Sequence, residues 1–290
     1  MHLRSELEMM SLFKKIVMDD PRIRLSVLEG SRTNRNIPKD NFQDYDISFF
    51  VTDMDSLKEN ETWLESFGTV IFMQKPEDME LYEPELGTWY SYLMYLSDGN
   101  KVDLTLIPLD EIDSYFKQSD GLVEVLIDKD NRVKGKTEAT DEKYWVKMPT
   151  EQEFIDCCNE FWHVTAYVAK GLYRKEILFA LDHFNEIVRP ELLRMISWEV
   201  GCREGFTFSL GKNYKFLDKY LEEEDFNRIL DTFSLQGYEE TWRSLKLCCQ
   251  LFISYSKKVA QKLEYSYPNY DEVMTDYITQ VYSNLSKQGD

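Results

Sequence analysis

The chain has 290 residues, of which 43% are hydrophobic and 14% aromatic, so it can form a large core and is not expected to be disordered. Its 34 Lys and Arg residues against 53 Asp and Glu residues give a net charge of −19. This charge disfavours nucleic acids and anionic membranes as partners and favours cationic ligands, although an acidic surface also serves solubility alone.

Strand-like and helix-like patterns alternate in the first half of the chain. Apolar residues at helical spacing come first, and the strands that follow are bounded by Gly30, by Pro108 and by the turn sequence 97–100. The expected helices cover residues 5–20, 53–67 and 109–117. The expected strands cover residues 22–29, 44–52, 69–74, 90–96, 101–107 and 122–127.

Only helical patterns remain after Thr150, which opens a capping box with Glu153. We expect the second helical stretch to be kinked or divided at Pro190. The expected helical stretches cover residues 154–168, 175–200, 213–233, 238–263 and 271–285. The polar segment 132–149 suits a linker. The pattern therefore predicts an α+β chain with two domains, residues 1–145 and an all-α bundle over 146–290.

The five cysteines match no zinc spacing and no C-x-x-C redox motif. They are Cys157, Cys158, Cys202, Cys248 and Cys249. Because they lie among apolar residues, we expect buried, reduced thiols. The N-terminal residues lack the apolar segment of a signal peptide, and no apolar run is long enough to cross a bilayer. We expect a cytoplasmic monomer or homodimer with no membrane partner.

A candidate phosphate site lies at the end of the first expected strand, at Gly30, Ser31 and Arg32. Glycine lets backbone amides approach a phosphate closely, and a serine hydroxyl can donate to a phosphate oxygen. Arginine can add charge-assisted hydrogen bonds. A lone Gly-Ser pair is weak as a signal.

Three acidic residues strengthen that interpretation. Strand alternation places Asp44 and Asp46 on one face, and two adjacent carboxylates repel unless a cation lies between them. Mg²⁺ suits such a pair, and a solvated strand edge is the alternative. Asp103 lies on the polar face of a later apolar strand. If that strand neighbours the first pair, Asp103 could be a third metal ligand or a general base.

In this order, Gly-Ser, Asp-x-Asp and a later strand Asp resemble the nucleotidyltransferase fold that DNA polymerase beta shares with antibiotic nucleotidyltransferases. Further segments resemble the aminoglycoside 6-adenylyltransferase family, which modifies streptomycin. They are residues 28–34 (LEGSRTN), 42–47 (FQDYDI), 51–55 (VTDMD), 73–80 (MQKPEDME), 157–162 (CCNEFW), 174–180 (RKEILFA) and 209–216 (SLGKNYKF). The resemblance covers nearly the whole chain, least clearly its end, with no departure at the motif positions.

The resemblance implies a mixed sheet with flanking helices, followed by a helical substrate-binding domain. It implies that Ser31 and Arg32 contact the triphosphate of ATP and that Asp44 and Asp46 hold Mg²⁺. The hydroxyl at position 6 of the streptidine ring would attack the α-phosphorus and release pyrophosphate. We expect Asp103 to be the general base, with Glu80 as its rival.

Streptidine carries two guanidinium groups, and planar cations of this kind bind to carboxylates and aromatic faces. The candidate acceptor-binding residues are Glu80, Trp89, Asn159, Glu160, Trp162 and Asp182. Each has a structural alternative, such as a place in the core for Trp162. Lys170 and Lys212 are candidates for countering phosphate charge. Alternative functions are nucleotidyl transfer to a lincosamide, a protein hydroxyl or a tRNA end, and a catalytically silent nucleotide-binding module.

Overall fold

The computed structural model describes residues 3–135 and 138–286, with side chains up to residue 284. The chain divides into two compact units, Met1–Lys143 and Tyr144–Asp290. Each unit has a hydrophobic core of its own.

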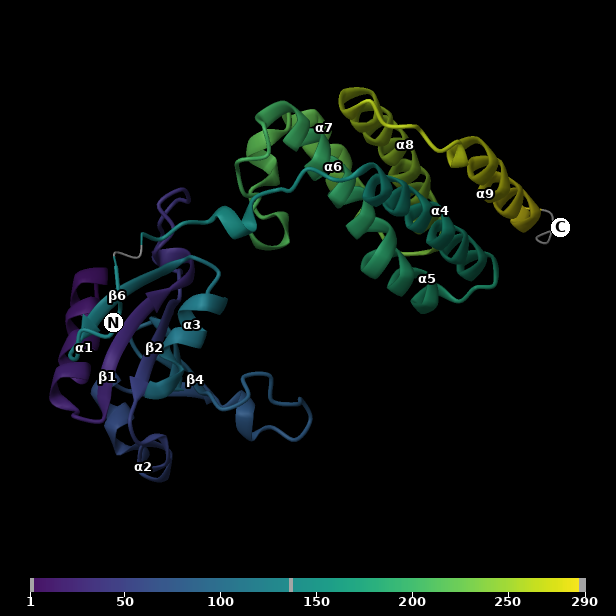
Figure 1. Cartoon of the computed structure of the whole chain (residues 1–290). Helices are drawn as coiled ribbons and strands as arrows, with labels where there is room; N and C mark the ends of the chain where they lie inside the picture. Colours follow the sequence, from purple (N-terminus) through teal and green to yellow (C-terminus); the bar gives the residue numbers. More distant parts are fainter. Residues whose placement is uncertain (1–2, 136–137, 287–290) are drawn as a thin grey trace. The chain divides into compact units, whose positions relative to one another are not determined.

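A mixed sheet forms the centre of the first unit (Figure 1). Within the described residues it has six strands in the order β3-β4-β5-β2-β1-β6. The strands are β1 (Ile23–Glu29), β2 (Tyr45–Val51), β3 (Val70–Gln74), β4 (Tyr90–Leu96), β5 (Lys101–Pro108) and β6 (Val123–Asp128). β2 and β5 run parallel, and the other neighbouring pairs are antiparallel. The expected mixed sheet with flanking helices is confirmed.

One face of the sheet is covered by helix α1 (Glu6–Asp19), helix α2 (Met54–Glu59) and the 3₁₀ helix Glu61–Phe67. α1 begins at a capping box in which the Ser5 hydroxyl accepts from the Glu8 amide and the Glu8 carboxylate accepts from the Ser5 amide. Every second residue of β2 and β5 faces this core, which fixes the register of both strands.

The opposite face is covered only in part. Helix α3 (Ile112–Gln118) packs there on a smaller apolar cluster that includes Val27, Phe50 and Ile107. These residues lie toward one end of their strands. Toward the other end, the side chains on the same face are acidic, so the sheet presents polar residues where α3 does not cover it.

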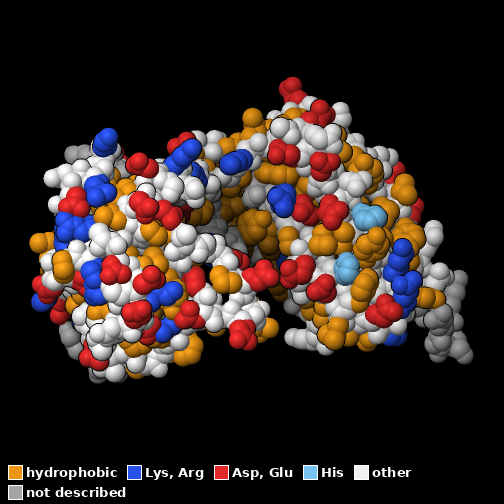
Figure 2. Space-filling model, turned by 60° about the horizontal axis from the view of Figure 1, so that its bottom comes forward, with side chains coloured by type: hydrophobic (Ala, Val, Ile, Leu, Met, Phe, Trp, Pro, Cys, Tyr) orange, Lys and Arg blue, Asp and Glu red, His pale blue; other side chains and the backbone are white. Residues whose placement is uncertain are grey.

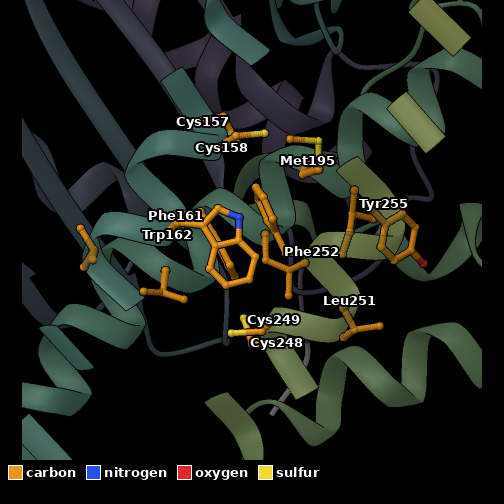
Figure 3. Close-up of a cluster of buried hydrophobic side chains, with 14 of the residues drawn as sticks. Cys157, Cys158, Phe161, Trp162, Met195, Cys248, Cys249, Leu251, Phe252 and Tyr255 are labelled. Atoms are coloured by element: carbon orange, nitrogen blue, oxygen red, sulfur yellow. The ribbon is translucent and has the colours of Figure 1, made fainter. Parts of the chain in front are cut away.

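The second unit is helical. Its helices are α4 (Glu151–Tyr173), α5 (Ile177–His183), α6 (Arg189–Glu204), α7 (Glu223–Asp231), α8 (Tyr238–Leu263) and α9 (Tyr270–Ser286). The predicted capping box of Thr150 and Glu153 begins α4. α4, α6 and α8 supply most of the core, in which the rings of Phe161 and Phe252 stack at 3.7 Å between centroids (Figure 3).

Two helical predictions need correction. Residues 175–200 are interrupted ahead of Pro190, by a π-helical segment over Phe184–Val188, and the proline lies in the first turn of α6. Because proline cannot donate to the residue four earlier, the ladder is rearranged before it. The stretch 213–233 is α-helical only over Glu223–Asp231 and has short 3₁₀ helices before it, and Asn213 and Tyr214 adopt positive φ values of 55° and 59°.

The cysteines behave as small core residues. Cys157, Cys158, Cys248 and Cys249 are buried, Cys202 is partly buried, and all five thiols are free. Burial raises the pKa of the Cys158 and Cys249 thiols to about 12. Among the residues described here, no helix is both long enough and apolar enough to span a membrane.

Candidate functional site

The loop after β1 begins with a glycine in the left-handed region. Gly30 has φ +67°, and its amide donates to the Leu122 carbonyl at 2.9 Å. A methyl carbon at Gly30 would overlap Oδ2 of Asp46. The glycine therefore lets the backbone pass directly against a carboxylate of the next strand. Ser31 follows in a short 3₁₀ helix, and among the described residues its hydroxyl makes no hydrogen bond.

The three predicted carboxylates come together on the uncovered part of the sheet. Asp46 in β2 lies in register with Asp103 in the parallel strand β5, and with Glu29 in the antiparallel strand β1. Asp44 lies just before β2 and is linked to Asp103 through the ammonium of Lys101, which is 2.7 Å from Oδ2 of each aspartate. The condition set by the sequence, that the two strands be neighbours, is met.

Burial and nearby negative charge disfavour the ionised forms of Asp46 and Glu29. Burial, together with the charges of Asp103, Asp44 and Glu29, raises the pKa of Asp46 to about 6. Burial also raises the pKa of Glu29, whose carboxylate accepts a hydrogen bond from the Ser48 hydroxyl. The centre therefore carries more negative charge than its protein partners compensate.

The residues fit a divalent cation. Carboxylate oxygens are the ligands that Mg²⁺ prefers, and Oδ1 of Asp103 is buried without a hydrogen-bond partner in the part of the chain that the structure describes. Among the described residues, no three acidic, histidine or cysteine side chains already stand in a metal-binding arrangement. The ammonium of Lys101 lies between two of the carboxylates, those of Asp44 and Asp103.

Arg32, which is predicted to contact a triphosphate, has partners within the chain. Its side chain is 5% exposed and donates to the carbonyls of Asp44 at 3.0 Å and Gln43 at 2.6 Å. The guanidinium carbon lies 3.6 Å from the centroid of the Tyr45 ring. In this structure Arg32 fixes the segment that leads into β2.

The connection between β3 and β4 projects from the sheet (Figure 1). It is anchored at its start, where the Ser91 amide and hydroxyl donate to Glu77 at 2.8 and 2.7 Å. Glu80 lies beyond this anchor on the exposed part. Trp89, predicted to contact an acceptor, packs beside Tyr115 and donates its indole N–H to Glu111 at 2.8 Å. Its N–H is thus already engaged.

The other predicted residues belong to the second unit. Of these, Trp162 lies in the hydrophobic core. It is 3% exposed and packs edge-on against Phe161 and Phe252, so the structural alternative holds for it (Figure 3). A core position offers no face to a ligand. Lys212 is exposed, and Lys170 is partly buried near the Tyr167 and Tyr277 rings.

Asn159 and Glu160 are exposed on α4, and Asp182 is exposed on α5. Beside them the rings of His163, Tyr167 and His183 form a surface cluster, with acidic side chains nearby (Figure 2). Carboxylates next to aromatic faces are suited to planar cations. The arrangement is therefore consistent in chemistry with the predicted role of these residues.

Sequence reasoning missed two residues at the acid cluster, Glu29 and Lys101. Both could have been found from strand alternation. Lys101 is two residues before Asp103 and must share its face, and Glu29 is the last residue of an otherwise apolar strand. The contacts themselves depend on the pairing of β2 with β5 and β1, which no local pattern specifies.

Comparison with known proteins gives consistent matches over the whole chain. A family model described as streptomycin adenylyltransferase matches residues 3–281. The aminoglycoside 6-adenylyltransferase of Bacillus subtilis (strain 168) is 57% identical over 283 residues, 98% of this chain and 100% of that protein. That of Staphylococcus aureus is 54% identical over 282 residues, 97% of this chain and 100% of that protein. A crystal structure of an aminoglycoside 6-adenyltransferase from Bacillus subtilis is 52% identical, with 97% of this chain and 99% of that chain covered and a TM-score of 0.49.

Proposed function

The chain belongs to the streptomycin adenylyltransferase family, and we propose that it transfers AMP from ATP to the hydroxyl at position 6 of the streptidine ring of streptomycin. Within this proposal, AMP transfer to an aminoglycoside is supported by membership of the family. The acceptor, the modified hydroxyl and the metal are the finer parts of the proposal. Adenylylation of the antibiotic would confer resistance to it.

The observation that carries the proposal is the in-register pair Asp46 and Asp103 on two parallel strands, at the uncovered part of the sheet. Asp44, Asp46 and Asp103 would hold Mg²⁺, which would neutralise charge on the phosphates of ATP. Gly30 gives the backbone its close approach to this cluster, and the Ser31 hydroxyl is available to donate to a phosphate oxygen.

The transfer step forms a bond between the acceptor oxygen and the α-phosphorus and breaks the bond from that phosphorus to the bridging oxygen of pyrophosphate. The leaving oxygen takes the electron pair, and the acceptor hydroxyl gives up its proton. Asp103 is the proposed base in addition to its place in the metal site, with Glu80 as the rival base. Positioning and charge neutralisation supply the rate enhancement.

The acidity of the protein supports a polycationic acceptor. The net charge of −19 attracts cations over distances beyond direct contact. Exposed Glu160 and Asp182 lie on helices that also carry the surface cluster of His163, Tyr167 and His183. We propose that this surface contributes to recognition of the guanidinium groups.

The test is pyrophosphate release from the purified protein with ATP and Mg²⁺, with each aminoglycoside offered separately. We expect release with streptomycin and with dihydrostreptomycin, which retains streptidine, and none with kanamycin, which lacks it. The product should carry one adenylyl group, located at position 6 by NMR.

Release with kanamycin but not streptomycin would overturn the acceptor assignment. No release with any aminoglycoside would turn the search to other hydroxyl acceptors, such as a lincosamide or a protein. ATP binding without release on any acceptor would indicate a catalytically silent module.

A further inference from the structure

Lys101 is a basic residue within the acid cluster, and the proposed reaction gives it no role. It is the first residue of β5, two before Asp103, so both side chains point to the same face of the sheet. Its ammonium is 2.7 Å from Oδ2 of Asp44 and 2.7 Å from Oδ2 of Asp103. A positive charge from the chain itself therefore joins two of the carboxylates assigned to the metal.

The ion pair between Lys101 and Asp103 is more buried than an ordinary surface pair. The Lys101 side chain is 20% exposed and the Asp103 side chain 23% exposed, so water screens the interaction only in part. Without a cation at this point, carboxylates on adjacent strands would repel each other. The ammonium thus holds Asp44 and Asp103 together.

One ammonium does not satisfy the cluster. Among the described residues, Oδ1 of Asp103 is buried and has no hydrogen-bond partner, and the ammonium of Lys101 donates to Asp44 and Asp103 but not to Asp46. An ammonium also carries only one charge. A divalent cation would compensate more of the negative charge and give the unpartnered oxygen a ligand role.

We propose that Lys101 is a built-in counter-ion for Asp44 and Asp103 and that its ammonium competes with the divalent cation that these carboxylates would hold. This inference rests on the metal site of the proposed function. It adds that the Lys101 ammonium and the divalent cation compete for the same carboxylates. Metal binding requires the ammonium to leave, so the metal binds less tightly than three uncommitted carboxylates would allow.

The displaced ammonium has an alternative position beside the ring of Tyr95. Tyr95 in β4 pairs with Lys101 in the strand register, and the ammonium is already 5.8 Å from the centroid of its ring. The Tyr95 side chain is 45% exposed. A lysine side chain can therefore turn from the carboxylates to this aromatic face, where its charge is available to an anionic ligand such as a triphosphate.

The test is Mn²⁺ binding to the full-length protein without nucleotide, measured by the EPR signal of free Mn²⁺. Lys101→Met should bind Mn²⁺ about tenfold or more tightly than the wild type, because a like charge at the metal position is removed. The matched control is Lys75→Met. Lys75 is also partly buried in the first unit and pairs with Glu61 at 2.6 Å, and its removal should leave Mn²⁺ affinity unchanged.

Unchanged or weaker Mn²⁺ binding in folded Lys101→Met would overturn the inference, since the ammonium would then only organise the carboxylates. Should that variant fail to fold, Lys101→Gln supplies the same comparison, and Lys101→Arg, which keeps the charge, should not tighten binding. Absence of Mn²⁺ binding in the wild type, with and without ATP, would instead contradict the metal site of the proposed function.

Discussion

At the scale of single residues, Gly30 decides how closely the backbone approaches the carboxylate of Asp46. Its φ of +67° and the overlap that a methyl carbon would make with Asp46 Oδ2 are two separate constraints. Gly87 separates the two constraints, since its φ of +64° is similar and an added methyl carbon would meet no described atom within 4 Å. It is therefore a matched control.

We expect Gly30→Ala to reduce the rate of AMP transfer about 100-fold, because it pushes Asp46 out of position. Gly87→Ala should leave the rate near that of the wild type. Both variants should lose about 1–2 kcal/mol of unfolding free energy from the left-handed backbone alone. Steady-state kinetics and urea denaturation measure the two effects. Equal activity losses in the two variants would mean that backbone strain, not contact with Asp46, is what matters.

Strand alternation predicted that Asp44 and Asp46 share a face and that Asp103 lies on the polar face of its own strand, but their meeting depends on the pairing of β2 with β5. It did not predict the role of Arg32, because a guanidinium can turn toward a ligand or toward carbonyls, and here the Gln43 and Asp44 carbonyls take it. Trp162 was ambiguous for the same kind of reason, since its neighbours in space are not its neighbours in sequence.

At the scale of elements, the β4–β5 hairpin carries Lys101 and Asp103 and is tied to the N-terminal segment through its turn. Asp98 in the turn accepts from the Arg4 guanidinium and from the amide and side chain of Asn100. Burial alone would raise the pKa of Asp98, but these donors and the charge of Arg4 lower it to about 2.

This lowered pKa gives a pH dependence with a definite sign. The stabilisation from ionised Asp98 is fully present above its ordinary pKa of 3.8 and is lost as the pH falls toward about 2. We expect Asp98→Asn to unfold at lower urea concentration than the wild type, with a constant difference above about pH 5 that narrows below about pH 4. Exposed Asp55→Asn should show little difference at any pH. A difference that widened on acidification would contradict the assignment.

Most elements could be predicted because their apolar residues repeat with a clear period. The strands and α1, α4 and α8 follow from this pattern and from capping residues. The structure of residues 213–233 could not be predicted in this way, since its first part is determined by the positive φ values of Gly211, Asn213 and Tyr214. These conformations, like the π-helical segment before Pro190, satisfy backbone and packing demands that periodicity does not reveal.

At the scale of the whole molecule, the chain has one unit with an acidic sheet surface and a second, helical unit with a hydrophobic core of its own. The family match over residues 3–281 spans both units, so both units belong to the part of the chain that the family shares. The net charge of −19 suits the polycationic acceptor and opposes nucleic acid. Composition predicted this preference, while the identity of the acceptor depends on the resemblance of longer segments.

The central claim, that the carboxylates on the uncovered part of the sheet carry out AMP transfer, is tested most directly by streptomycin-dependent pyrophosphate release from Asp46→Asn. We expect turnover to fall about 1000-fold, with the circular dichroism spectrum and melting temperature retained. Asp55→Asn, the same change at an exposed position on α2, should keep wild-type turnover. Near-normal turnover in Asp46→Asn would contradict the account, because the pair that Asp46 forms with Asp103 would then be dispensable.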